Sequence, residues 1–402
     1  MGSGKMRTSN RVLNRGIWSL RCTRGNCPPA TSKPCWLNGH FGKGREPGVD
    51  VVGYLLSEIG LGEAARLIVR ALEAADIPTG FVNVPLEGRM NERSTAERLA
   101  KTKRHGIALS ILGATELPMF SRRTCRGQTN IAYPFWELPT FQADWKRAFD
   151  GFDAYWAPSN FIREMLIANQ DKPVHLIPQP VFLPDVAPAP QTFSGPLKFY
   201  AFFDFASFIN RKNPMGAIEA FRVAFPLGTE DVTLTIKARG NPSEPVRDEL
   251  YHLASSDQRI QIREELLSRQ EMSALMQECN VFLSLHRSEG FGLGCAEALA
   301  HGKIVVATDF GGTKDFISNT SGYPVSFKQV PLSRKDYPGA EGSYWAEPDT
   351  EHAASILKEI YANPTCSSNR PIAGYHHLKN NNSFLAVGRA IRDNLTANTE
   401  RH

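Results

Sequence analysis

Short apolar runs alternate with amphipathic stretches along the first half of this chain. Runs of four to eight mostly apolar residues occur at 49–56, 81–84, 107–112, 154–157 and 174–177. Parallel strands are buried on both faces and therefore read as continuous hydrophobic runs, so we expect five strands here. Between the first two runs, small and apolar residues recur at helical spacing and predict a helix with one apolar face: Ala64, Leu67, Ile68, Ala71, Leu72 and Ala75. This pattern predicts a first α/β domain over residues 49–178.

A second alternation follows a stretch that contains six prolines between residues 178 and 196. Proline stiffens the chain and stops helices, so residues 179–196 are predicted to be a helix-free linker. Apolar runs at 197–203, 232–237, 281–285 and 304–307 predict strands of a second domain over residues 197–383. Helical patterns lie at 214–225, 244–255, 270–278, 295–301, 351–361 and 384–395. Two segments are predicted to be loops: the aromatic and proline-rich residues 130–139, and the long stretch after Asp315.

The basic charge of the chain is concentrated in its first 48 residues. These hold nine Lys and Arg residues against one acidic residue, Glu46, a net charge of +8. Since the whole chain carries +5, the remainder carries −3. The net charge of −3 on the rest of the chain gives no reason to expect a nucleic-acid partner. The segment is rich in Gly, Ser, Asn and Pro, and is predicted to be a disordered tail.

Composition points to an ordinary water-soluble protein in a reducing compartment. The hydrophobic share of 42% and the charged share of 22% are typical of globular chains. No run approaches the roughly 18 apolar residues of a membrane helix, and no secretory signal is readable. Seven cysteines scattered over 402 residues do not resemble a disulfide framework, so we expect a cytoplasmic protein. Two other hypotheses for the tail are contact with an anionic membrane surface and zinc binding by Cys22, Cys27, Cys35 and His40.

The strongest chemical signal lies in residues 281–312. An apolar run leads into a glycine-rich turn (residues 290–294), a helix, a second apolar run and the pair Gly311-Gly312. This is a βαβ unit whose two glycine loops lie at the carboxyl edge of the sheet, where α/β proteins bind ligands. Glu289 lies in the first loop, and Glu297 is predicted to lie on the opening turn of the helix. The turn residues Gly290, Phe291 and Gly292, together with His286 before them, are candidate ligand contacts.

Gly60 and Gly62 follow the first predicted strand and open a helix. The pattern Gly60-x-Gly62-x-x-Ala65 formally matches the dinucleotide fingerprint. Three residues separate the strand from Gly60, however, and Asn83 and Val84 stand where the fingerprint requires an acid. Two interpretations remain: a loop whose backbone N–H groups bind a phosphate at the helix N-terminus, or tight packing alone.

Three cations are candidates for binding an anionic ligand. Arg211 and Lys212 directly precede Asn213-Pro214, where a helix is predicted to begin. Cations at a helix N-terminus oppose the helix dipole, so an anion shared with the helix end would explain them; an ordinary solvated basic pair is the alternative. Lys237 ends a predicted buried strand at the carboxyl edge and is the third candidate.

The segment from Glu289 to Glu297 resembles the E-x7-E motif of the retaining, nucleotide-sugar-dependent glycosyltransferases of family 4, or group 1. Further segments resemble a bacterial subgroup associated with surface polysaccharide assembly: SEIGLGEAAR (57–66), NIAYPFWELP (130–139), YWAPSNFI (155–162), INRKNPMGAIEAF (209–221), SLHRSEGFGLGCAEALAHGKIVVATDF (284–310) and YWAEPD (344–349). The resemblance covers most of residues 50–395. It implies the GT-B fold, with two Rossmann-like domains facing across a cleft and a C-terminal segment (384–402) that crosses back to the first domain.

The resemblance also implies roles for the candidate residues. Glu289 would contact the hydroxyls of the donor sugar, and Glu297 would bind the ribose. Arg211 and Lys212 would neutralise the diphosphate leaving group, which Gly60 and Gly62 would approach from the first domain. Fixed cations and helix N-termini can stabilise that charge, so no metal or other cofactor is expected. Retention would follow from front-face attack, since no second carboxylate is evident as a nucleophile.

Two positions depart from the family pattern. Asp204 to Ser207 stand where family members carry a glycine-arginine pair, and Arg211 is the candidate replacement for the missing cation. Thr115-Glu116 stand near the place of a histidine often used beside the sugar.

The sequence therefore predicts transfer of a hexose, with mannose slightly favoured, from a nucleotide-diphosphate sugar to a saccharide or lipid-linked acceptor in surface polysaccharide synthesis. The site of action would be the cytoplasm or the inner face of the membrane. A nicotinamide-dependent oxidoreductase is one alternative, and the missing acid after the second strand argues against it. A non-catalytic protein that binds nucleotide sugars or glycans is another, which would be expected to have lost Glu289 or the basic pair.

Overall fold

The computed structural model describes residues 46–87, 95–99, 105–117, 128–141, 149–240 and 244–397. The predicted tail lies outside these residues except for 46–48, which already belong to the first strand. The zinc and membrane hypotheses for the tail therefore concern residues that the structure does not describe. Among the described helices, none is long and apolar enough to cross a membrane.

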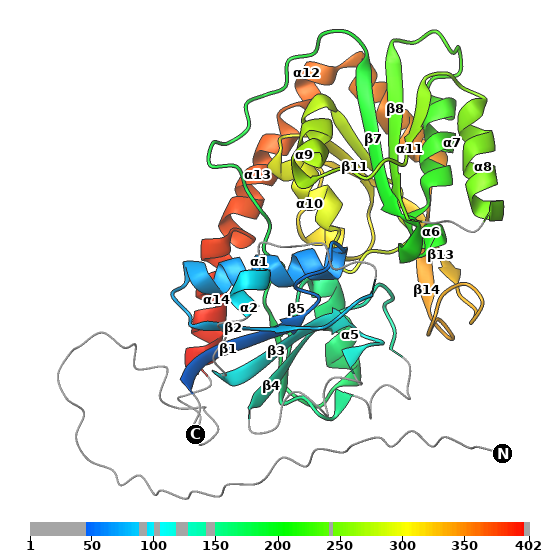
Figure 1. Ribbon diagram of the computed structural model, residues 1–402. Coiled ribbons are helices and arrows are strands. Elements are labelled where there is room, and N and C mark those ends of the chain that lie inside the picture. Colours follow the sequence, from blue (N-terminus) through cyan, green and yellow to red (C-terminus); the bar gives the residue numbers. More distant parts are fainter. Residues whose placement is uncertain are drawn as a thin grey trace, which may run out of the picture. The chain divides into compact units, whose positions relative to one another are not determined.

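The first sheet has six parallel strands in the order β2-β1-β3-β4-β5-β6 (Figure 1). Helices α1 and α14 pack on one face of it, and α5 packs on the other. The elements are β1 (Glu46–Gly53), α1 (Gly60–Ala74), β2 (Thr79–Asn83), α2 (Ala96–Leu99), β3 (His105–Gly113), β4 (Thr129–Phe135), β5 (Ala154–Ala157), α5 (Asn160–Asn169) and β6 (Val174–Leu176).

The second sheet also has six parallel strands, in the order β12-β11-β10-β7-β8-β9. Helices α7 and α11 cover one face, while α9, α10 and α13 cover the other. The elements are β7 (Leu197–Asp204), η2 (Phe205–Ser207), α6 (Ile209–Lys212), α7 (Pro214–Ala224), β8 (Val232–Arg239), α8 (Glu244–Ser255), β9 (Ile260–Arg263), α9 (Arg269–Glu278), β10 (Val281–Ser284), α10 (Leu293–Ala300), β11 (Ile304–Thr308), η3 (Gly312–Asp315) and β12 (Tyr323–Val325).

A two-stranded antiparallel hairpin and four helices complete the described chain. The hairpin pairs Phe327 with Pro348 at its base and Pro331 with Tyr344 towards its tip. The elements are β13 (Phe327–Pro331), β14 (Tyr344–Pro348), α11 (Thr350–Ala362), α12 (Pro364–Ser367), α13 (Arg370–Asn381) and α14 (Phe384–Ala397).

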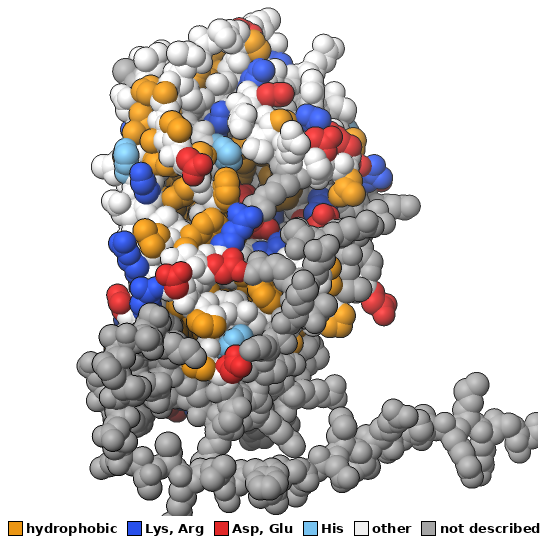
Figure 2. Space-filling model, turned by 60° about the vertical axis from the view of Figure 1, so that its left-hand side comes forward, with side chains coloured by type: hydrophobic (Ala, Val, Ile, Leu, Met, Phe, Trp, Pro, Cys, Tyr) orange, Lys and Arg blue, Asp and Glu red, His pale blue; other side chains and the backbone are white. Residues whose placement is uncertain are grey.

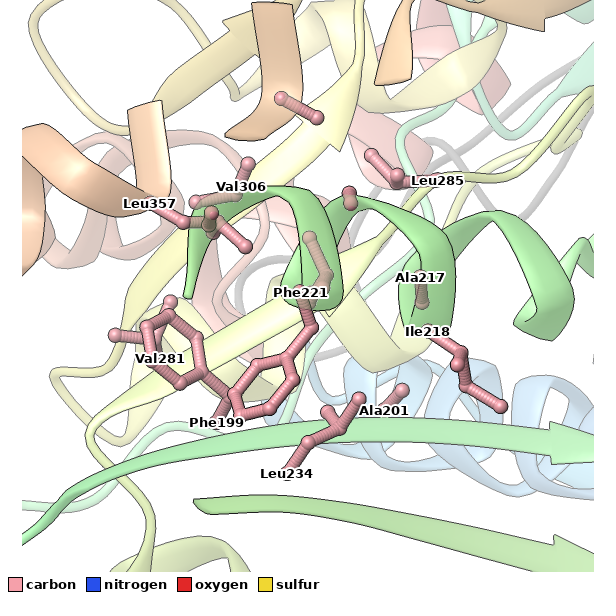
Figure 3. Packing of buried hydrophobic residues seen from close by; sticks show 14 of the residues in the cluster. Phe199, Ala201, Ala217, Ile218, Phe221, Leu234, Val281, Leu285, Val306 and Leu357 are labelled. Atoms are coloured by element: carbon pink, nitrogen blue, oxygen red, sulfur yellow. The ribbon is translucent and has the colours of Figure 1, made fainter. Parts of the chain in front are cut away.

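Aliphatic side chains and a group of phenylalanines fill the core between the second sheet and α7 (Figure 3). Phe221 on α7 lies over Phe199 on β7, with ring centroids 5.7 Å apart, and Phe225 contacts both rings. All three are fully or almost fully buried. Each aromatic side chain that leaves water contributes a large hydrophobic term, so this face of the second sheet is a rigid base for the loops at its carboxyl edge.

The C-terminal helix α14 packs on α1, so the chain crosses back to the first domain, as the family resemblance implies. Val387 and Ile391 are fully buried in the same core cluster as α1. A Cβ on Gly388 would lie 2.3 Å from the carbonyl oxygen of Ala71, so the two helices touch backbone to backbone. Asn394 accepts a hydrogen bond of 2.9 Å from the indole of Trp156 on β5. The end of the chain thus supports the first sheet.

Residues 177–196 contain no helix or strand, which fits the predicted linker. Two predicted loops were partly wrong. Residues 130–135 belong to β4, because Pro134 lies beyond the part of β4 that pairs with β5 and disturbs no hydrogen bond there. The stretch after Asp315 contains β12, β13 and β14, three strands too short to give a clear alternating pattern. The strand β9 and helix α13 were also missed; α13 buries little more than Pro371, Gly374, Tyr375 and Leu378.

The surface drawn in Figure 2 carries charged side chains of both signs next to one another, mixed with hydrophobic and other side chains. No continuous basic face is visible on the described residues in that view.

Candidate functional site

Glu289 lies in the loop that joins β10 to α10, and two adjacent cations hold its carboxylate. Its Oε2 is 3.0 Å from Nη1 of Arg211, and its Oε1 is paired with Nζ of Lys212. The Glu289 side chain is 12% exposed, that of Arg211 5% and that of Lys212 24%. The structure therefore brings together the three residues that were predicted to be catalytic.

Arg211 and Lys212 directly precede Asn213, the N-cap of α7, where the sequence predicted a helix to begin. They also form the last turn of the short helix α6, which the sequence did not predict. The side chain of Asn213 accepts the N–H of Gly216 at 3.2 Å. Glu289 supplies the counter-charge that sequence reasoning had assigned to a ligand.

Arg211 is almost fully buried and fixed by the protein itself. It donates to the carbonyl oxygen of Ser288 at 2.9 Å and to that of Ser207 at 3.3 Å, in addition to its pair with Glu289. Ser207 belongs to the segment that lacks the cation of the family pattern, so the guanidinium of Arg211 does reach that region. Arg211 holds the loops together, while Lys212 is the more exposed of the two cations.

The charges of this cluster are stable near neutral pH. Burial alone would raise the pKa of Glu289, but Lys212, Arg211 and His286 outweigh it and lower the pKa to about 2. Burial would lower the pKa of Arg211, but Glu289, Glu137 and Tyr337 raise it above the ordinary value. His286 has its pKa lowered, chiefly by burial, and is therefore neutral at pH 7. At neutral pH the cluster contains a carboxylate, a guanidinium and an uncharged imidazole.

These shifts predict a protein that loses stability in acid in two stages. Unfolded His286 takes a proton below its ordinary pKa of 6.5, whereas the folded protein resists protonation, so the free energy of unfolding should fall below that pH. The contribution of Glu289 is complete above its ordinary pKa of 4.5 and is lost as the pH falls from there towards about 2. Urea unfolding at pH 7, 5.5, 4 and 3 measures this dependence. Glu289→Gln should flatten the part below pH 4.5, and an unchanged slope would contradict the assignment.

His286 and the glycines around it shape the loop rather than face solvent. His286 has no exposed surface; its Nδ1 lies 3.1 Å from Ser284 Oγ and its Nε2 lies 3.0 Å from the carbonyl oxygen of Phe310. Gly292 has a φ of 88°, in the left-handed region that favours glycine. A Cβ on Gly290 would lie 2.7 Å from the carbonyl oxygen of Trp136, which follows β4 of the first sheet. These predicted substrate contacts are thus packed against protein in the structure.

Phe291 and Gly290 tie the loop to its neighbours. Phe291 is 3% exposed and packs on Phe316 with ring centroids 5.3 Å apart. The carbonyl oxygen of Gly290 accepts a 2.6 Å hydrogen bond from Ser159, the residue that caps α5. Contacts from both sheets therefore fix the position of Glu289.

The glycines that open α1 serve different purposes. A Cβ on Gly62 would lie 2.2 Å from the carbonyl oxygen of Ser57, so packing accounts for that glycine. A Cβ on Gly60 would meet nothing within 4 Å, so packing does not account for it. The N-cap residue, Ile59, makes no side-chain hydrogen bond to the helix end. Of the two glycines, only Gly60 therefore remains a candidate for binding an anion at the helix N-terminus.

Substitution of the two glycines should separate these roles. Gly62→Ala should lower the free energy of unfolding, because backbone must move to admit the methyl group. Gly60→Ala should leave the thermal midpoint unchanged or slightly higher, since alanine is the better helix former. If phosphate approaches the Gly60 backbone closely, the same change should weaken the binding of a nucleoside diphosphate. Thermal unfolding with and without ligand measures both effects; unchanged binding would leave Gly60 without a ligand role.

Lys237 lies on β8, at the carboxyl edge of the second sheet. It is 3% exposed, its Nζ donates to the carbonyl oxygen of Ala238 at 2.7 Å, and burial lowers its pKa. Two residues further on, Arg239 pairs with Glu58 at 3.6 Å. Glu58 lies two residues before Gly60, the first residue of α1, so this contact brings the loop before Gly60 to the end of β8.

Glu297 lies one turn inside α10, because that helix begins at Leu293 rather than Cys295. Its carboxylate is one of the charges that raise the pKa of the Tyr200 phenol, after burial and the Cys279 thiol. The Tyr200 hydroxyl is buried and has no hydrogen-bond partner among the described residues. Glu297 therefore lies near β7 and a phenol that sequence reasoning did not single out.

Glu137 and Tyr337 are the main site residues that sequence reasoning missed. Oε1 of Glu137 lies 3.7 Å from Nη2 of Arg211, and Oε2 accepts a 2.8 Å hydrogen bond from the Tyr337 hydroxyl. Glu137 belongs to the NIAYPFWELP segment, whose unusual composition was the only signal. Glu137 and Glu289 both pair with Arg211, so the structure places a second carboxylate beside the one that the sequence singled out.

Glu116, near the place of the family's histidine, is engaged inside the first sheet. Its Oε2 accepts the N–H of Gly113 at 3.1 Å. Tyr54 lies beside it, and its pKa is raised by burial first and then by the Glu116 carboxylate. Glu116 and Tyr54 thus form a small polar group at the carboxyl ends of β1 and β3.

Residues 197–330 match the family model described as Glycosyl transferases group 1. The matched segment contains Arg211, Lys212, Glu289 and Glu297, and includes β7 to β12 of the second sheet. Residues 197–330 are therefore similar to the glycosyltransferases of group 1. No curated protein matches the chain significantly.

Several solved structures share the fold at low sequence identity. HepE of Anabaena in complex with UDP-glucose has a TM-score of 0.62 and 12% identity, over 87% of this chain and 99% of that one. A glycosyltransferase from Rickettsia africae has a TM-score of 0.60 and 15% identity, over 87% and 98%. TarM, also solved from S. aureus, has a TM-score of 0.54 and 12% identity. The match covers 72% of this chain and 54% of TarM, so this chain spans only about half of the length of TarM. The glycosyltransferase fold is thus GT-B, which confirms the expected fold class.

The described residues contain no group of three or more His, Cys, Asp or Glu side chains placed to hold a metal ion. Cysteines 279 and 295 are buried thiols, and burial raises the pKa of Cys279 to about 11.

Proposed function

We propose that the protein is a retaining transferase that moves a hexose from a nucleoside-diphosphate sugar to a saccharide or lipid-linked saccharide in the assembly of a surface polysaccharide. The cytoplasmic side of a membrane is the proposed place of action, with no metal or other cofactor. The observation that carries this proposal is the cluster of Glu289, Arg211 and Lys212 at the carboxyl edge of the matched domain. Neighbouring structures solved with UDP-glucose or with UDP and GlcNAc support the donor class.

The cluster suits the electrostatics of this reaction. Cleavage of a glycosyl–phosphate bond develops negative charge on the diphosphate, and preorganised cations stabilise such charge without reorganisation. Lys212 is exposed enough to meet a ligand, and the α1 N-terminus at Gly60 offers backbone N–H groups. Glu289 can accept sugar hydroxyls as well as its cations, since a carboxylate has about four acceptor sites. Glu297 is proposed to bind the ribose.

The proposal retains front-face attack, although Glu137 lies near Arg211. Both oxygens of Glu137 have partners: the Tyr337 hydroxyl at 2.8 Å and, at the longer distance of 3.7 Å, Arg211. These contacts favour a role for Glu137 in positioning rather than in covalent attack. The anomeric configuration of the product, followed by NMR from the first turnovers, tests retention.

A thermal-shift screen against nucleotide sugars tests the function most directly. GDP-mannose is the first donor to try, and UDP-glucose the second because HepE was solved with it. A donor at 100 times its dissociation constant should stabilise the folded state by about 2.7 kcal/mol. The same donor should then be turned over in the presence of EDTA. Binding without turnover with any acceptor would favour the non-catalytic alternative, and stabilisation by NAD alone would favour the oxidoreductase.

A further inference from the structure

Phe208 has two energetically unfavourable features, a strained backbone conformation and an exposed aromatic side chain. It links η2 to α6, three residues before Arg211, and its φ is 59°, which non-glycine residues rarely adopt. Its side chain is also 47% exposed, although large aromatic residues usually contribute to the core. Strained residues of this kind gather at functional sites, where the surrounding structure holds them in place.

Tyr337, in the segment between β13 and β14, packs against the Phe208 ring. The two ring centroids are 4.7 Å apart with an interplanar angle of 55°. Tyr337 is itself only 5% exposed and packs on Trp136 with centroids 5.6 Å apart. Trp136 directly follows β4, so residues next to the first sheet and the hairpin together hold the Phe208 ring while leaving about half of its surface exposed.

A carboxylate lies at the other end of the same phenol. The Tyr337 hydroxyl donates to Glu137 Oε2 at 2.8 Å, and the Glu137 side chain remains 24% exposed. Glu137 Oε1 lies 3.7 Å from Arg211, which also pairs with Glu289 at 3.0 Å. Tyr337 therefore contacts both an exposed aromatic ring, that of Phe208, and a partly exposed carboxylate, that of Glu137. Glu137 in turn lies beside Arg211, which pairs with Glu289, the residue proposed to contact the donor sugar.

The hairpin that carries Tyr337 is anchored directly beside Glu289. Arg287 makes two bonds to Glu347 on β14, at 2.5 and 2.9 Å, and donates to the carbonyl oxygen of Asn210 on α6 at 2.7 Å. Its guanidinium also lies over the Trp345 ring, 5.5 Å from the centroid. The position of Tyr337 is thus set relative to the Glu289 loop and to α6.

This pair of groups matches the chemistry of a pyranose ring. One face of a hexopyranose presents C–H bonds, which are attracted to the negative face of an aromatic ring, while its rim presents hydroxyls that a carboxylate accepts. We propose that Phe208, Tyr337 and Glu137 form the subsite for a pyranose ring of the acceptor, with Phe208 in contact with the sugar face and Glu137 with its hydroxyls. This inference rests on the proposed function of the same site.

The first test is binding of simple hexosides. Saturation-transfer NMR would use methyl α-D-mannopyranoside and methyl α-D-glucopyranoside with the full-length protein in the presence of the nucleoside diphosphate selected by the donor screen. The wild type should transfer saturation to ring C–H protons, Phe208→Ala should lose this signal, and Phe208→Trp should keep it. Tyr361→Ala is the matched control: Tyr361 on α11 is 39% exposed and likewise has one described ring partner, Phe225 at 5.5 Å. Equal signals from Phe208→Ala and the wild type, or no hexoside binding to the wild type, would overturn the subsite.

The second test is the effect on kinetics. Phe208→Ala should raise the acceptor KM by about 3- to 10-fold, the range expected for one lost aromatic contact, and should change the donor KM much less. Glu137→Gln should raise the acceptor KM as well, while donor hydrolysis without acceptor continues. A larger change in the donor KM would instead place the nucleobase on Phe208, and loss of donor hydrolysis in Glu137→Gln would make Glu137 catalytic; either result contradicts the subsite. If no nucleotide sugar binds or turns over with the wild type, the proposed function itself fails.

Discussion

Replacing Glu289 by Gln should reduce glycosyl transfer on the order of 10²- to 10³-fold, the usual effect of removing one preorganised electrostatic group. The amide cannot balance Arg211 and Lys212, and it is a weaker acceptor for the sugar hydroxyls. Loss of one partner from a buried ion pair costs up to about 3–5 kcal/mol, and Arg211 keeps Glu137 and two carbonyl oxygens, so the lower end of that range is expected. Initial rates at saturating donor, together with urea unfolding, measure the two effects separately.

Glu359→Gln is the matched control for this change. Glu359 on α11 is also a carboxylate paired with an arginine, Arg370 at 3.9 Å, but its side chain is 55% exposed. Exposed pairs contribute about 0–1 kcal/mol, so both transfer and stability should stay near the wild-type values. A folded Glu289→Gln protein that transfers sugar at the wild-type rate would remove Glu289 from the mechanism.

Arg211→Ala should chiefly lower the stability of the protein, whereas Lys212→Ala should chiefly weaken ligand binding. Arg211→Ala leaves the carbonyl oxygens of Ser288 and Ser207 without their donor and Glu289 with Lys212 alone, so the free energy of unfolding should fall by about 3–5 kcal/mol. Lys212 is more exposed, so Lys212→Ala should change stability little. It should instead weaken nucleoside-diphosphate binding roughly 10- to 100-fold, as expected for one charged hydrogen bond.

Calorimetric titration with a nucleoside diphosphate and with the matching nucleoside distinguishes these outcomes. Only the diphosphate should lose affinity in Lys212→Ala. Lys212→Arg serves as the control, because it keeps the charge but changes its geometry, and it should retain most of the affinity. A stable Arg211→Ala protein with weakened diphosphate binding would show that Arg211 contacts phosphate directly, against the role assigned here.

The sequence located the unit of residues 281–312 well because every signal in it is local. Buried parallel strands are apolar throughout, a glycine with positive φ ends the loop before the helix, and Glu289 lies between them. The loop assigned to residues 130–139 failed for the opposite reason: aromatic residues and proline suggested a loop, whereas the pairing of β4 with β3 decided the strand. The roles of Gly60 and Gly62 could not be separated either, because the carbonyl oxygens that crowd Gly62 come from the preceding turn.

The sequence pattern by itself predicted two α/β halves, since hydrophobic periodicity acts over short distances along the chain. The resemblance to known glycosyltransferases implied the GT-B fold and the roles of Glu289, Arg211 and Lys212. The tertiary structure alone decided that Arg211 is a buried clamp and that Lys212 is the more exposed cation. It also brought Glu137 and Tyr337 to the site from segments 200 residues apart. Contacts across such separations depend on how both sheets and the hairpin pack together, and no local pattern in the chain encodes that packing.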